Sequence, residues 1–421
     1  MRVVVQFLKR YMLAPACYDL ETVVSRFREE MQRGLEGEKS SLLMIPTFVS
    51  PEAGEIAPQT VIVLDAGGTN LRVGAVTFSG GVVTDVDFQK YPLPGTSEPL
   101  TKTAFFDAIA ERLSPYLDRG SRIGFCFSYA ADCMENHDAK IVAFCKEVTV
   151  TGAEGAEICK ELSEAIRRRG IQKTYSFVQL NDTVATQLGG MAASDRESYG
   201  GYIGFILGTG MNGCYTERTE RIKKYTGGIY RAENMIVNME AGCYSGFEKG
   251  ALDRAVDAQS AIPGDHQAEK MMSGAYLGKI LCHALKAANA EGVTQSAIPQ
   301  ELSEIPMPDV NAFLANQPGM LDALIAPQDR ETVRAIIEGL YSRTARLMAI
   351  IFASVALHTG QGTSKPMCIV LEGSTYQKSP RLQAHLAEEL ETVRQKFGCR
   401  FEIIQAENPT LTGSAYAAVS N

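Results

Sequence analysis

A short run of small, hydroxylated and charged residues follows an apolar segment, and its residue types suit a phosphate-binding turn. The run is Asp65-Ala66-Gly67-Gly68-Thr69-Asn70-Leu71-Arg72. Its two glycines allow the backbone to approach a phosphate closely and to present N–H groups to it. Asp65 could orient Mg²⁺ directly or through water, and Arg72 could meet phosphate charge. A tight β-hairpin with glycine at positive φ explains the same residues equally well.

A second turn of similar composition, Gly208-Thr209-Gly210-Met211-Asn212-Gly213, follows the apolar run 202–207. It matches the pattern GxGxxG of nicotinamide-binding proteins, and Glu233 stands roughly 20 residues further on. A Rossmann turn, however, must open a helix. Here residues 214–216 have the composition of a strand that returns. The pattern therefore favours a hairpin that binds phosphate over a nicotinamide site.

Three acidic residues elsewhere could act on a hydroxylated substrate. Asp182 lies in Asn181-Asp182-Thr183, directly after the apolar run 175–180. A carboxylate at such a strand end could take a proton from a substrate hydroxyl, although Asp182 alone would more simply cap the helix that starts at Thr183. Glu240 and Glu269 could accept hydrogen bonds from sugar hydroxyls. Their spacing does not show that they meet.

Apolar strand patterns and amphipathic helix patterns alternate along the chain, which predicts an α/β fold. Predicted strands occupy 61–64, 72–77, 82–91, 202–207, 214–216, 235–239, 367–371 and 401–404. Predicted helices occupy 18–35, 105–117, 331–359, 381–396 and 413–419. A strand, a small-residue turn with a hydroxyl and a second strand occur twice. Two such halves suggest a ligand cleft between them.

The composition excludes several classes of function. The 421 residues are 45% hydrophobic and 21% charged, with a net charge of -8, which argues against general nucleic-acid binding. The longest apolar run, 347–358, is shorter than the roughly 18 residues of a membrane span and predicts a buried helix. Ten cysteines without a Cys-x-x-Cys pair predict free thiols in a reducing compartment. We therefore expect a cytoplasmic protein without nucleic-acid or membrane partners.

Several segments together resemble, in their order along the chain, the motifs of the hexokinase family in its eukaryotic-type branch. The segments are MIPTFV at 44–49, LDAGGTNLRV at 64–73, LNDTVAT at 180–186, LGTGMNGCY at 207–215, VNMEAGCYSGF at 237–247, PGDHQAEKMMSGAYLGKI at 263–280 and LEGSTY at 371–376. Each motif is moderately specific, whereas the ordered set is highly specific. The resemblance covers most of the chain.

The resemblance implies a fold of two actin-like (ribonuclease H-like) α/β domains with a cleft that closes on sugar. The small domain would comprise 59–180 plus 406–421, and the large domain 1–58 plus 181–405. The implied reaction transfers the γ-phosphoryl group of MgATP to the 6-hydroxyl of a hexose, with D-glucose expected first. ATP and Mg²⁺ are the implied cofactors, and hexose and nucleotide the implied partners. The oligomeric state stays open.

The resemblance also assigns roles to individual residues. Asp182 would be the general base, Asp65 would organise Mg²⁺, and Arg72, with Lys146, would complete the catalytic set. The implied sugar contacts are Ser128, Cys145, Lys146, Asn181, Asp182, Asn212, Glu240 and Glu269. The implied nucleotide and phosphate contacts are Asp65, Gly67, Gly68, Thr69, Asn70, Arg72, Gly208, Thr209, Gly210, Gly373, Ser374 and Thr375.

Some positions depart from the family pattern. Tyr129-Ala130 stands where the family usually has Phe-Pro, and Cys145 stands where it has a sugar-contacting threonine. A thiol is a weak donor, so one contact should weaken by about 0.5–1.5 kcal/mol. Ala241 replaces a frequent tryptophan, and 412–415 lacks the usual lysine. These changes could raise the KM for glucose or shift preference to another hexose.

Three alternative functions remain open at this point. The first is a related kinase for another sugar or an amino sugar, although the cysteine-rich zinc motif of the bacterial repressor-type kinases is absent. The second is a sugar-binding sensor that has lost catalysis, against which the intact Asp65, Arg72, Asp182 and Thr209 argue. The third is an ATPase of the actin superfamily, which the sugar-binding segments do not favour.

Overall fold

The computed structural model describes residues 2–52, 54, 56–144 and 148–421. Strands and helices alternate along them, so the predicted α/β class is confirmed. The contacts between residues divide the chain into two compact units. Unit 1 comprises Met1–Leu43, Phe205–Gly213 and Met239–Glu402, and unit 2 comprises Met44–Gly204, Cys214–Asn238 and Ile403–Asn421. The domain boundaries expected from the sequence stay a prediction.

Unit 2 contains a five-stranded sheet in which three parallel strands lie beside an antiparallel meander. Its strands, in the order β10-β6-β2-β3-β4, are β10 (Ser176–Leu180), β6 (Arg122–Phe127), β2 (Gln59–Gly67), β3 (Asn70–Ser79) and β4 (Val82–Pro92). Strands β2, β6 and β10 run parallel, whereas β3 and β4 pair antiparallel. The carboxyl ends of the parallel strands therefore meet at one edge of the sheet.

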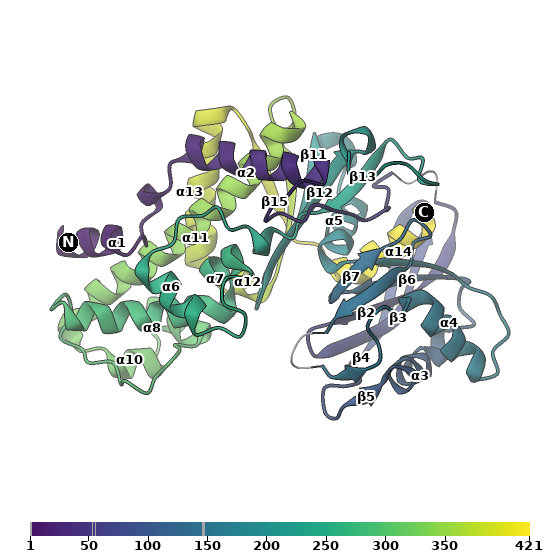
Figure 1. Cartoon of the computed structure of the whole chain (residues 1–421), viewed down its shortest axis with the longest axis horizontal. Helices are drawn as coiled ribbons and strands as arrows, with labels where there is room; N and C mark the ends of the chain where they lie inside the picture. Colours follow the sequence, from purple (N-terminus) through teal and green to yellow (C-terminus); the bar gives the residue numbers. More distant parts are fainter. Residues whose placement is uncertain (1, 53, 55, 145–147) are drawn as a thin grey trace. The chain divides into compact units, whose positions relative to one another are not determined.

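The continuous apolar run of β2 has a physical reason, because both faces of the sheet are covered. Ile62 and Leu64 face a cluster built with α3 (Lys102–Leu113) and α4 (Ile158–Arg168). Val61 and Val63 face the opposite cluster, which α14 (Pro409–Ser420) covers. Figure 1 shows α14 lying against this sheet on the face away from α3 and α4. Burial on both faces thus fixes the direction in which β2 presents its end.

Helix α5 (Asp182–Ala193), which follows β10, packs closely against α14 through glycines. A Cβ atom added to Gly413 would collide with the backbone of Ala185 and Gly189. One added to Gly189 would collide with the backbone of Pro409. The two helix backbones are therefore in direct contact, and α14 holds the first turns of α5 in place.

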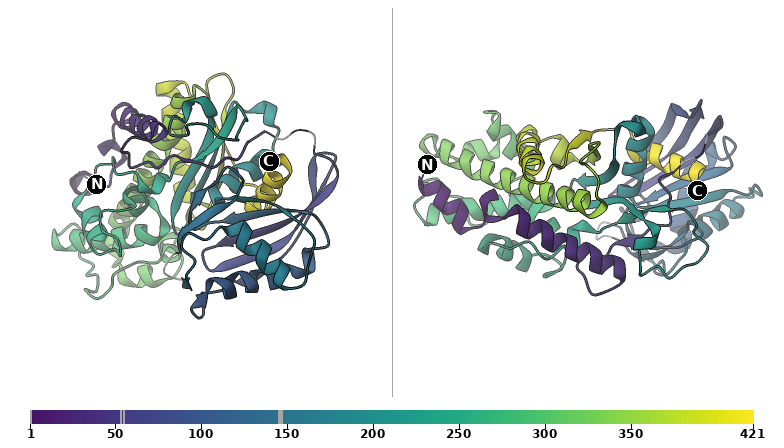
Figure 2. Two further views of the ribbon diagram at one scale, coloured as in Figure 1. Left: turned by 45° about the vertical axis from the view of Figure 1, so that its right-hand side comes forward. Right: turned by 90° about the horizontal axis from the view of Figure 1, so that it is seen from above.

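The core of unit 1 is the long helix α11 (Arg330–Thr359). The helices that pack against it are α1 (Arg2–Arg10), α2 (Leu20–Glu36), α8 (Gly274–Ala290) and α13 (Pro380–Phe397). Figure 2 shows α2 and α13 running alongside it. By length and composition alone, Pro327–Thr359 could cross a membrane, but 83% of its most apolar window is buried in the structure. The predicted buried helix at 347–358 is thereby confirmed.

A six-stranded sheet carries the second small-residue turn. Its strands, in the order β1-β13-β12-β11-β14-β15, are β1 (Ile45–Pro46), β13 (Asn234–Asn238), β12 (Met211–Arg218), β11 (Gly201–Leu207), β14 (Met367–Glu372) and β15 (Phe401–Ile404). Because β11 is followed by strand β12, the turn at 208–210 opens no helix. The expected strand return is confirmed, and the Rossmann requirement is not met.

The remaining elements are short. They are β5 (Leu100–Thr101), β7 (Ala130–Cys133), β8 (Ala139–Ala143), β9 (Val150–Thr151), α6 (Ala251–Ala258), α7 (Gln267–Met272), α9 (Met307–Leu314), α10 (Met320–Leu324) and α12 (Ser374–Gln377). Single turns of 3₁₀-helix include Ala241–Cys243, directly after Glu240.

The contact between α5 and α14 generates a stability prediction. We expect Gly413→Ala to lower the free energy of unfolding by about 1–3 kcal/mol or more, because the added methyl group must push two backbones apart. Gly54→Ala is the control, since a Cβ there meets nothing within 4 Å. Urea unfolding followed by circular dichroism gives both values. A loss at Gly413 no larger than that at Gly54 would contradict the close packing.

Candidate active site

Three predicted site segments lie at the carboxyl ends of the parallel strands of unit 2. In the sheet register Asp65 of β2 is opposite Cys126 of β6, and Cys126 is opposite Leu180 of β10. Ser128 is the first residue after β6, and Asp182 is the second residue after β10. The fold therefore brings Asp65, Ser128 and Asp182 to one edge, where ligands bind in open α/β sheets.

The Cys126 thiol lies among these groups. Burial, followed by the charges of Asp65 and Asp182, raises the pKa of Cys126 well above its ordinary value. The thiol therefore stays neutral at physiological pH. It fills the space between the strand ends without adding a third negative charge. Nothing in the sequence marks Cys126, because a lone cysteine within an apolar strand has no visible link to the two carboxylates.

Asp65 is held by charge and by hydrogen bonds. Its side chain is 9% exposed and forms an ion pair with Arg72. Nε of Arg72 donates to Oδ2 of Asp65 at 2.9 Å, and the hydroxyl of Thr410 donates to the same oxygen at 2.9 Å. Nη2 of Arg72 also donates to Thr410 Oγ1 at 2.6 Å. Asp65, the expected magnesium ligand, and Arg72, the expected partner of phosphate charge, thus neutralise each other.

The turn between β2 and β3 is a two-residue β-hairpin turn. The tight hairpin that the sequence of residues 65–72 also allowed is therefore the observed backbone. Gly67 pairs with Asn70, which leaves Gly68 and Thr69 in the loop, with Gly68 at φ 58°. Both loop residues are exposed. The Tyr129 hydroxyl donates to Gly68 O at 2.5 Å. The hairpin is compatible with phosphate binding, because its tip exposes backbone groups and the Thr69 hydroxyl at the surface.

Gly67 shows why this turn needs a small residue. A Cβ atom there would lie 2.7 Å from Oγ of Ser128. The phosphate-type turn and the expected sugar-contacting serine are therefore direct neighbours in space, although one follows β2 and the other follows β6. No spacing rule in the sequence connects them.

Asn181 is the cap of helix α5, and Asp182 is its first residue. Asn181 Oδ1 accepts hydrogen bonds from Thr183 N at 3.0 Å and from Thr183 Oγ1 at 2.7 Å. Asp182 Oδ1 also accepts from Thr183 N, at 2.9 Å. The interpretation of Asp182 as N-cap was therefore wrong by one residue. Its position in the first turn suits a carboxylate, because the helix dipole favours negative charge there.

Unit 1 brings together the carboxylates whose meeting the sequence left open. Nδ2 of Asn212 donates to Oε1 of Glu240 at 3.1 Å, and Met211 N donates to Oε2 of Glu269 at 3.0 Å. Oδ1 of Asn212 accepts from Ala241 N at 3.2 Å. Asn212, Glu240 and Glu269 thus form one polar group around β12.

The electrostatics of this group follow from its burial. Burial raises the pKa of Glu269, and the nearby charge of Glu240 adds to the shift while the Met211 N–H opposes it. Two carboxylates held this close favour a ligand that donates hydrogen bonds. Glu240 has φ 53°, in the left-handed region, which is uncommon outside glycine. The backbone thus takes an unusual conformation at an expected sugar contact.

The expected nucleotide segments of unit 1 also lie together. The Gly208 carbonyl accepts hydrogen bonds from Gly274 N and from Oγ1 of Thr375, each at 2.8 Å. Gly373, at φ 108°, would collide with the backbone of Leu207 if it carried a Cβ atom. The loop at 373–375 therefore packs directly on the loop at 208–210. Thr209 and Ser374 present exposed hydroxyl-bearing side chains.

Two expected sugar contacts, Cys145 and Lys146, lie outside the described residues. The nearby departure Ala130 is exposed and begins β7, where it pairs with Ala143 across an irregular register. Proline is tolerated at the first residue of a strand and beside such an irregularity. The structure therefore gives no reason for the alanine at this position.

The residues at the ends of β2, β6 and β10, and the acidic group around β12, define an α/β protein that is equipped to bind phosphate and polyols. Two family models, both described as hexokinase, match residues 6–192 and 202–420. Hexokinase-1 of Schizosaccharomyces pombe is 30% identical over 94% of this chain and 86% of that protein. Human Hexokinase-2 is 28% identical over 93% of this chain, which spans 45% of that protein's length.

Solved structures agree with these matches at the level of the fold. A hexokinase from Schistosoma mansoni, in complex with glucose, has a TM-score of 0.81 and 24% identity, and the match covers 100% of this chain and 98% of that one. A second hexokinase structure has a TM-score of 0.77 at 20% identity. The chain therefore belongs to the hexokinase family and is a hexose kinase, that is, a phosphotransferase. Its fold is that of the actin-like sugar kinases.

Several polar residues beside the site were not found from the sequence. Thr410 contacts Asp65 from 345 positions away in the chain, and no local pattern marks it. Cys243, Asp265 and His266 lie close to one another, near Glu269. Cysteine, aspartate and histidine are potential metal ligands. Their separation in the sequence hid the cluster, because it follows no common metal-binding spacing.

The group of Asp65, Arg72 and Thr410 generates a second prediction. We expect Thr410→Val to lower the free energy of unfolding by about 1–2 kcal/mol, because valine keeps the shape but loses hydrogen bonds to an ion pair. Thr412→Val is the matched control, since the Thr412 hydroxyl donates to carbonyls of its own helix at 3.3 Å. Urea unfolding of both variants tests this. Equal losses would show that the Thr410 hydroxyl does not support the pair.

Proposed function

We propose that this hexose kinase transfers the γ-phosphoryl group of MgATP to the 6-hydroxyl of D-glucose, with Asp182 as general base. The observation that carries the proposal is the meeting of Asp65, Ser128 and Asp182 at the ends of three adjacent parallel strands. This arrangement places a carboxylate, a hydroxyl and a charge-compensated acid beside an exposed glycine turn. Phosphoryl transfer needs mainly such positioning and one base on the nucleophile.

Asp182 suits the role of base for reasons of geometry and charge. It lies in the first turn of α5, where its Oδ1 is fixed by Thr183 N. A carboxylate fixed in this way would accept the proton of the sugar hydroxyl as the new P–O bond forms. General-base assistance of this kind contributes about 10²–10⁴-fold to rate. Asn181, which caps the same helix, would orient the sugar beside it.

The carboxylates of unit 1 support a polyol substrate. Glu240 and Glu269 are acceptors held by Asn212 and by the Met211 N–H. Sugar hydroxyls that donate to ionised carboxylates form stronger hydrogen bonds than those between neutral groups. Glucose is the hexose that we propose, and the complex of the Schistosoma mansoni enzyme with glucose supports this choice.

The residues also fit a nucleotide with its magnesium ion. The chemistry that bound Mg²⁺ supplies is neutralisation of phosphate charge, and carboxylate oxygen is a ligand that it prefers. Asp65 is the residue that would hold it. The exposed Thr69 and Thr209 would contact phosphates, and Gly373 to Thr375 would line the adenosine site. Arg72, paired with Asp65 in this structure, would offset charge on the transferred group.

A cytoplasmic location is part of the proposal. Each described cysteine carries a free thiol, which suits a reducing compartment.

The role of Asp182 leads to a kinetic prediction. We expect Asp182→Asn to lower turnover by about 10²–10⁴-fold. Its Kd for glucose should rise by no more than about tenfold, because only one hydrogen-bonding contact changes. Asp195→Asn is the matched control: Asp195 follows α5 and caps a 3₁₀ turn, where it accepts from Glu197 N at 3.1 Å. ADP release measures turnover, and calorimetry measures the Kd.

The same assay decides the substrate and the alternatives. MgATP is supplied with glucose, mannose, fructose or N-acetylglucosamine, and both ADP and sugar phosphate are measured. Turnover on glucose that Asp182→Asn removes is the expected result. Turnover on a different sugar alone would replace glucose as the substrate. Sugar binding without turnover would indicate a sensor, and ATP hydrolysis that no sugar changes would indicate an ATPase of the actin superfamily.

A further inference from the structure

Three side chains of unit 1 form a cluster of potential metal ligands outside the set assigned above. Cys243 ends the short turn after Glu240, and Asp265 and His266 lie in the loop before α7. One ligand atom from each of the three residues lies within 4.8 Å of the others. A thiol, an imidazole and a carboxylate are the donor types of zinc sites.

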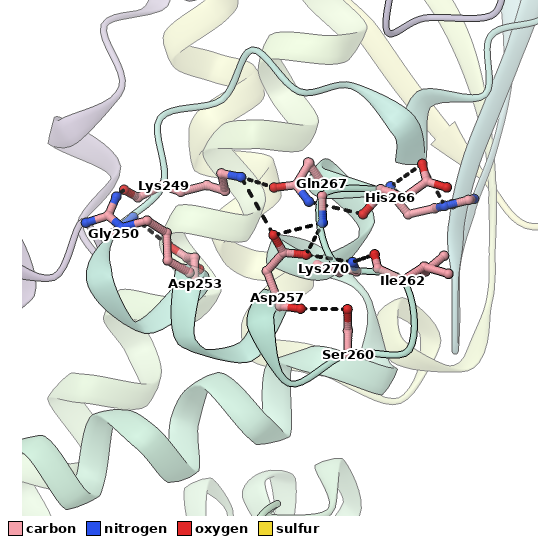
Figure 3. A network of polar contacts seen from close by, with 12 residues as sticks. Lys249, Gly250, Asp253, Asp257, Ser260, Ile262, His266, Gln267 and Lys270 are labelled. Carbon is pink, nitrogen blue, oxygen red and sulfur yellow. Dashed lines mark hydrogen bonds and ion pairs between the residues drawn. The ribbon is translucent and has the colours of Figure 1, made fainter.

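The loop that carries two of these ligands is held by its own polar network (Figure 3). Lys270, only 3% exposed, donates to Asp257 Oδ1 at 2.7 Å and to Ile262 O at 2.6 Å. The Asp257 carboxylate also accepts from Gly264 N at 3.1 Å. Lys249 contacts Gln267 and Asp257 from the other side. The loop is therefore positioned by its surroundings, as metal-binding loops are by their supporting hydrogen bonds.

His266 has a conformation and a polar atom that the network leaves unexplained. Its φ is 47°, in the left-handed region, which is uncommon outside glycine. Its Nδ1 is buried and has no hydrogen-bond partner among the described residues, although Asp265 Oδ1 lies 3.3 Å away. A buried imidazole nitrogen beside a carboxylate and a thiol is a position that a cation would satisfy.

The charge around the cluster favours a cation. Burial, followed by the negative charges of Glu240, Asp265 and Glu269, raises the pKa of the Cys243 thiol to about 12. The charges of His266 and Lys270 act against the burial of Glu269, because they lower its pKa. Two nearby carboxylates could supply a fourth ligand, or water could occupy that position. Thiolate and imidazole donors select zinc over magnesium or calcium, which prefer oxygen ligands.

We propose that Cys243, Asp265 and His266 bind Zn²⁺, and that this binding opposes the binding of sugar at Glu240 and Glu269. Zinc binding at this site does not depend on the proposed function. Its effect on the binding of sugar rests on the proposed function. A zinc ion beside Glu269 would attract the carboxylate that is to accept sugar hydroxyls. Coupling between two sites is reciprocal, so sugar must weaken zinc binding by the factor by which zinc weakens sugar binding.

The first experiment measures zinc binding to the full chain by competition with a chromophoric chelator, with ZnCl₂ as the probe. We expect one site, and a loss of zinc affinity by about 100-fold in Cys243→Ser and in His266→Asn. Cys17→Ser and His283→Asn are the matched controls, since neither residue belongs to the cluster. They should bind zinc as the unchanged chain does. Circular dichroism verifies that every variant is folded.

A spectroscopic readout keeps the proposal falsifiable if one variant folds poorly. Co²⁺ replaces zinc, and a thiolate-to-cobalt charge-transfer band reports the Cys243 ligand directly in the unchanged protein. We expect this band to be present, and to be absent in Cys243→Ala. A chain without a zinc site, without the band, or with equal zinc affinity in the cluster variants and their controls would overturn the site.

The coupling is tested by binding, so that it is separate from turnover. Calorimetry with glucose is performed with and without saturating ZnCl₂, on the unchanged chain and on His266→Asn. We expect zinc to weaken glucose binding by about tenfold, equivalent to a coupling within the usual range, and to have no such effect in His266→Asn. Equal glucose affinity with and without zinc would overturn the coupling and leave the metal site intact. Failure of glucose to bind at all would instead contradict the proposed function.

Discussion

The parallel pairing of β2, β6 and β10 is the constraint on which the site in unit 2 depends. Asp65, Cys126 and Leu180 are neighbours in register, so the residues directly after each strand must emerge at one edge. The sheet can hold this register because both of its faces are buried, one under α3 and α4 and the other under α14. Neither a longer loop nor a stronger charge could replace that alignment. The chemistry of the site follows from it.

The polar groups of unit 1 are organised on a different principle. Here the expected contacts are fixed by backbone N–H groups and by close approaches that glycine permits. Met211 N holds Glu269, and a Cβ atom on Gly210 would lie 2.8 Å from the same carboxylate. Gly373 lets its loop pack on Gly208 in a comparable way. Glu269 and the loop at 373–375 are thus positioned by backbone, whereas Glu240 accepts from the side chain of Asn212.

Many of the strands and long helices were predictable because their patterns are local, whereas β6 and α8 were not predicted. The apolar run 61–64 lies within β2, and 331–359 lies within α11. The observed boundaries differ from the predicted ones where polar residues still pair between strands. Strand β3 starts at Asn70 and not at Arg72, because Asn70 closes the hairpin with Gly67. The predicted helix 105–117 ends earlier, at Leu113, and continues as the 3₁₀ turn Ser114–Tyr116, which contains a proline.

The site was predictable only in part. Asp65, Asp182, Glu240 and Glu269 were found because their motifs are contiguous, and the structure places each pair within its own unit. Distant partners were not found, because a bond such as that from Thr410 to Asp65 joins residues 345 positions apart. The left-handed backbone conformation of Glu240 could not be predicted either, since glutamate is not a residue type that indicates it.

The place of α14 in unit 2 has a consequence for how the chain is made. The sheet strands and α5 are complete by residue 204, but the helix that covers one sheet face comes from Ile403–Asn421. Nearly two hundred residues of other sequence, Phe205–Gly213 and Met239–Glu402 among them, must be synthesised in between. During that interval Val61 and Val63 have no cover, and exposed apolar strands invite aggregation. This face of the sheet therefore stays open to contact with other chains until α14 has been synthesised.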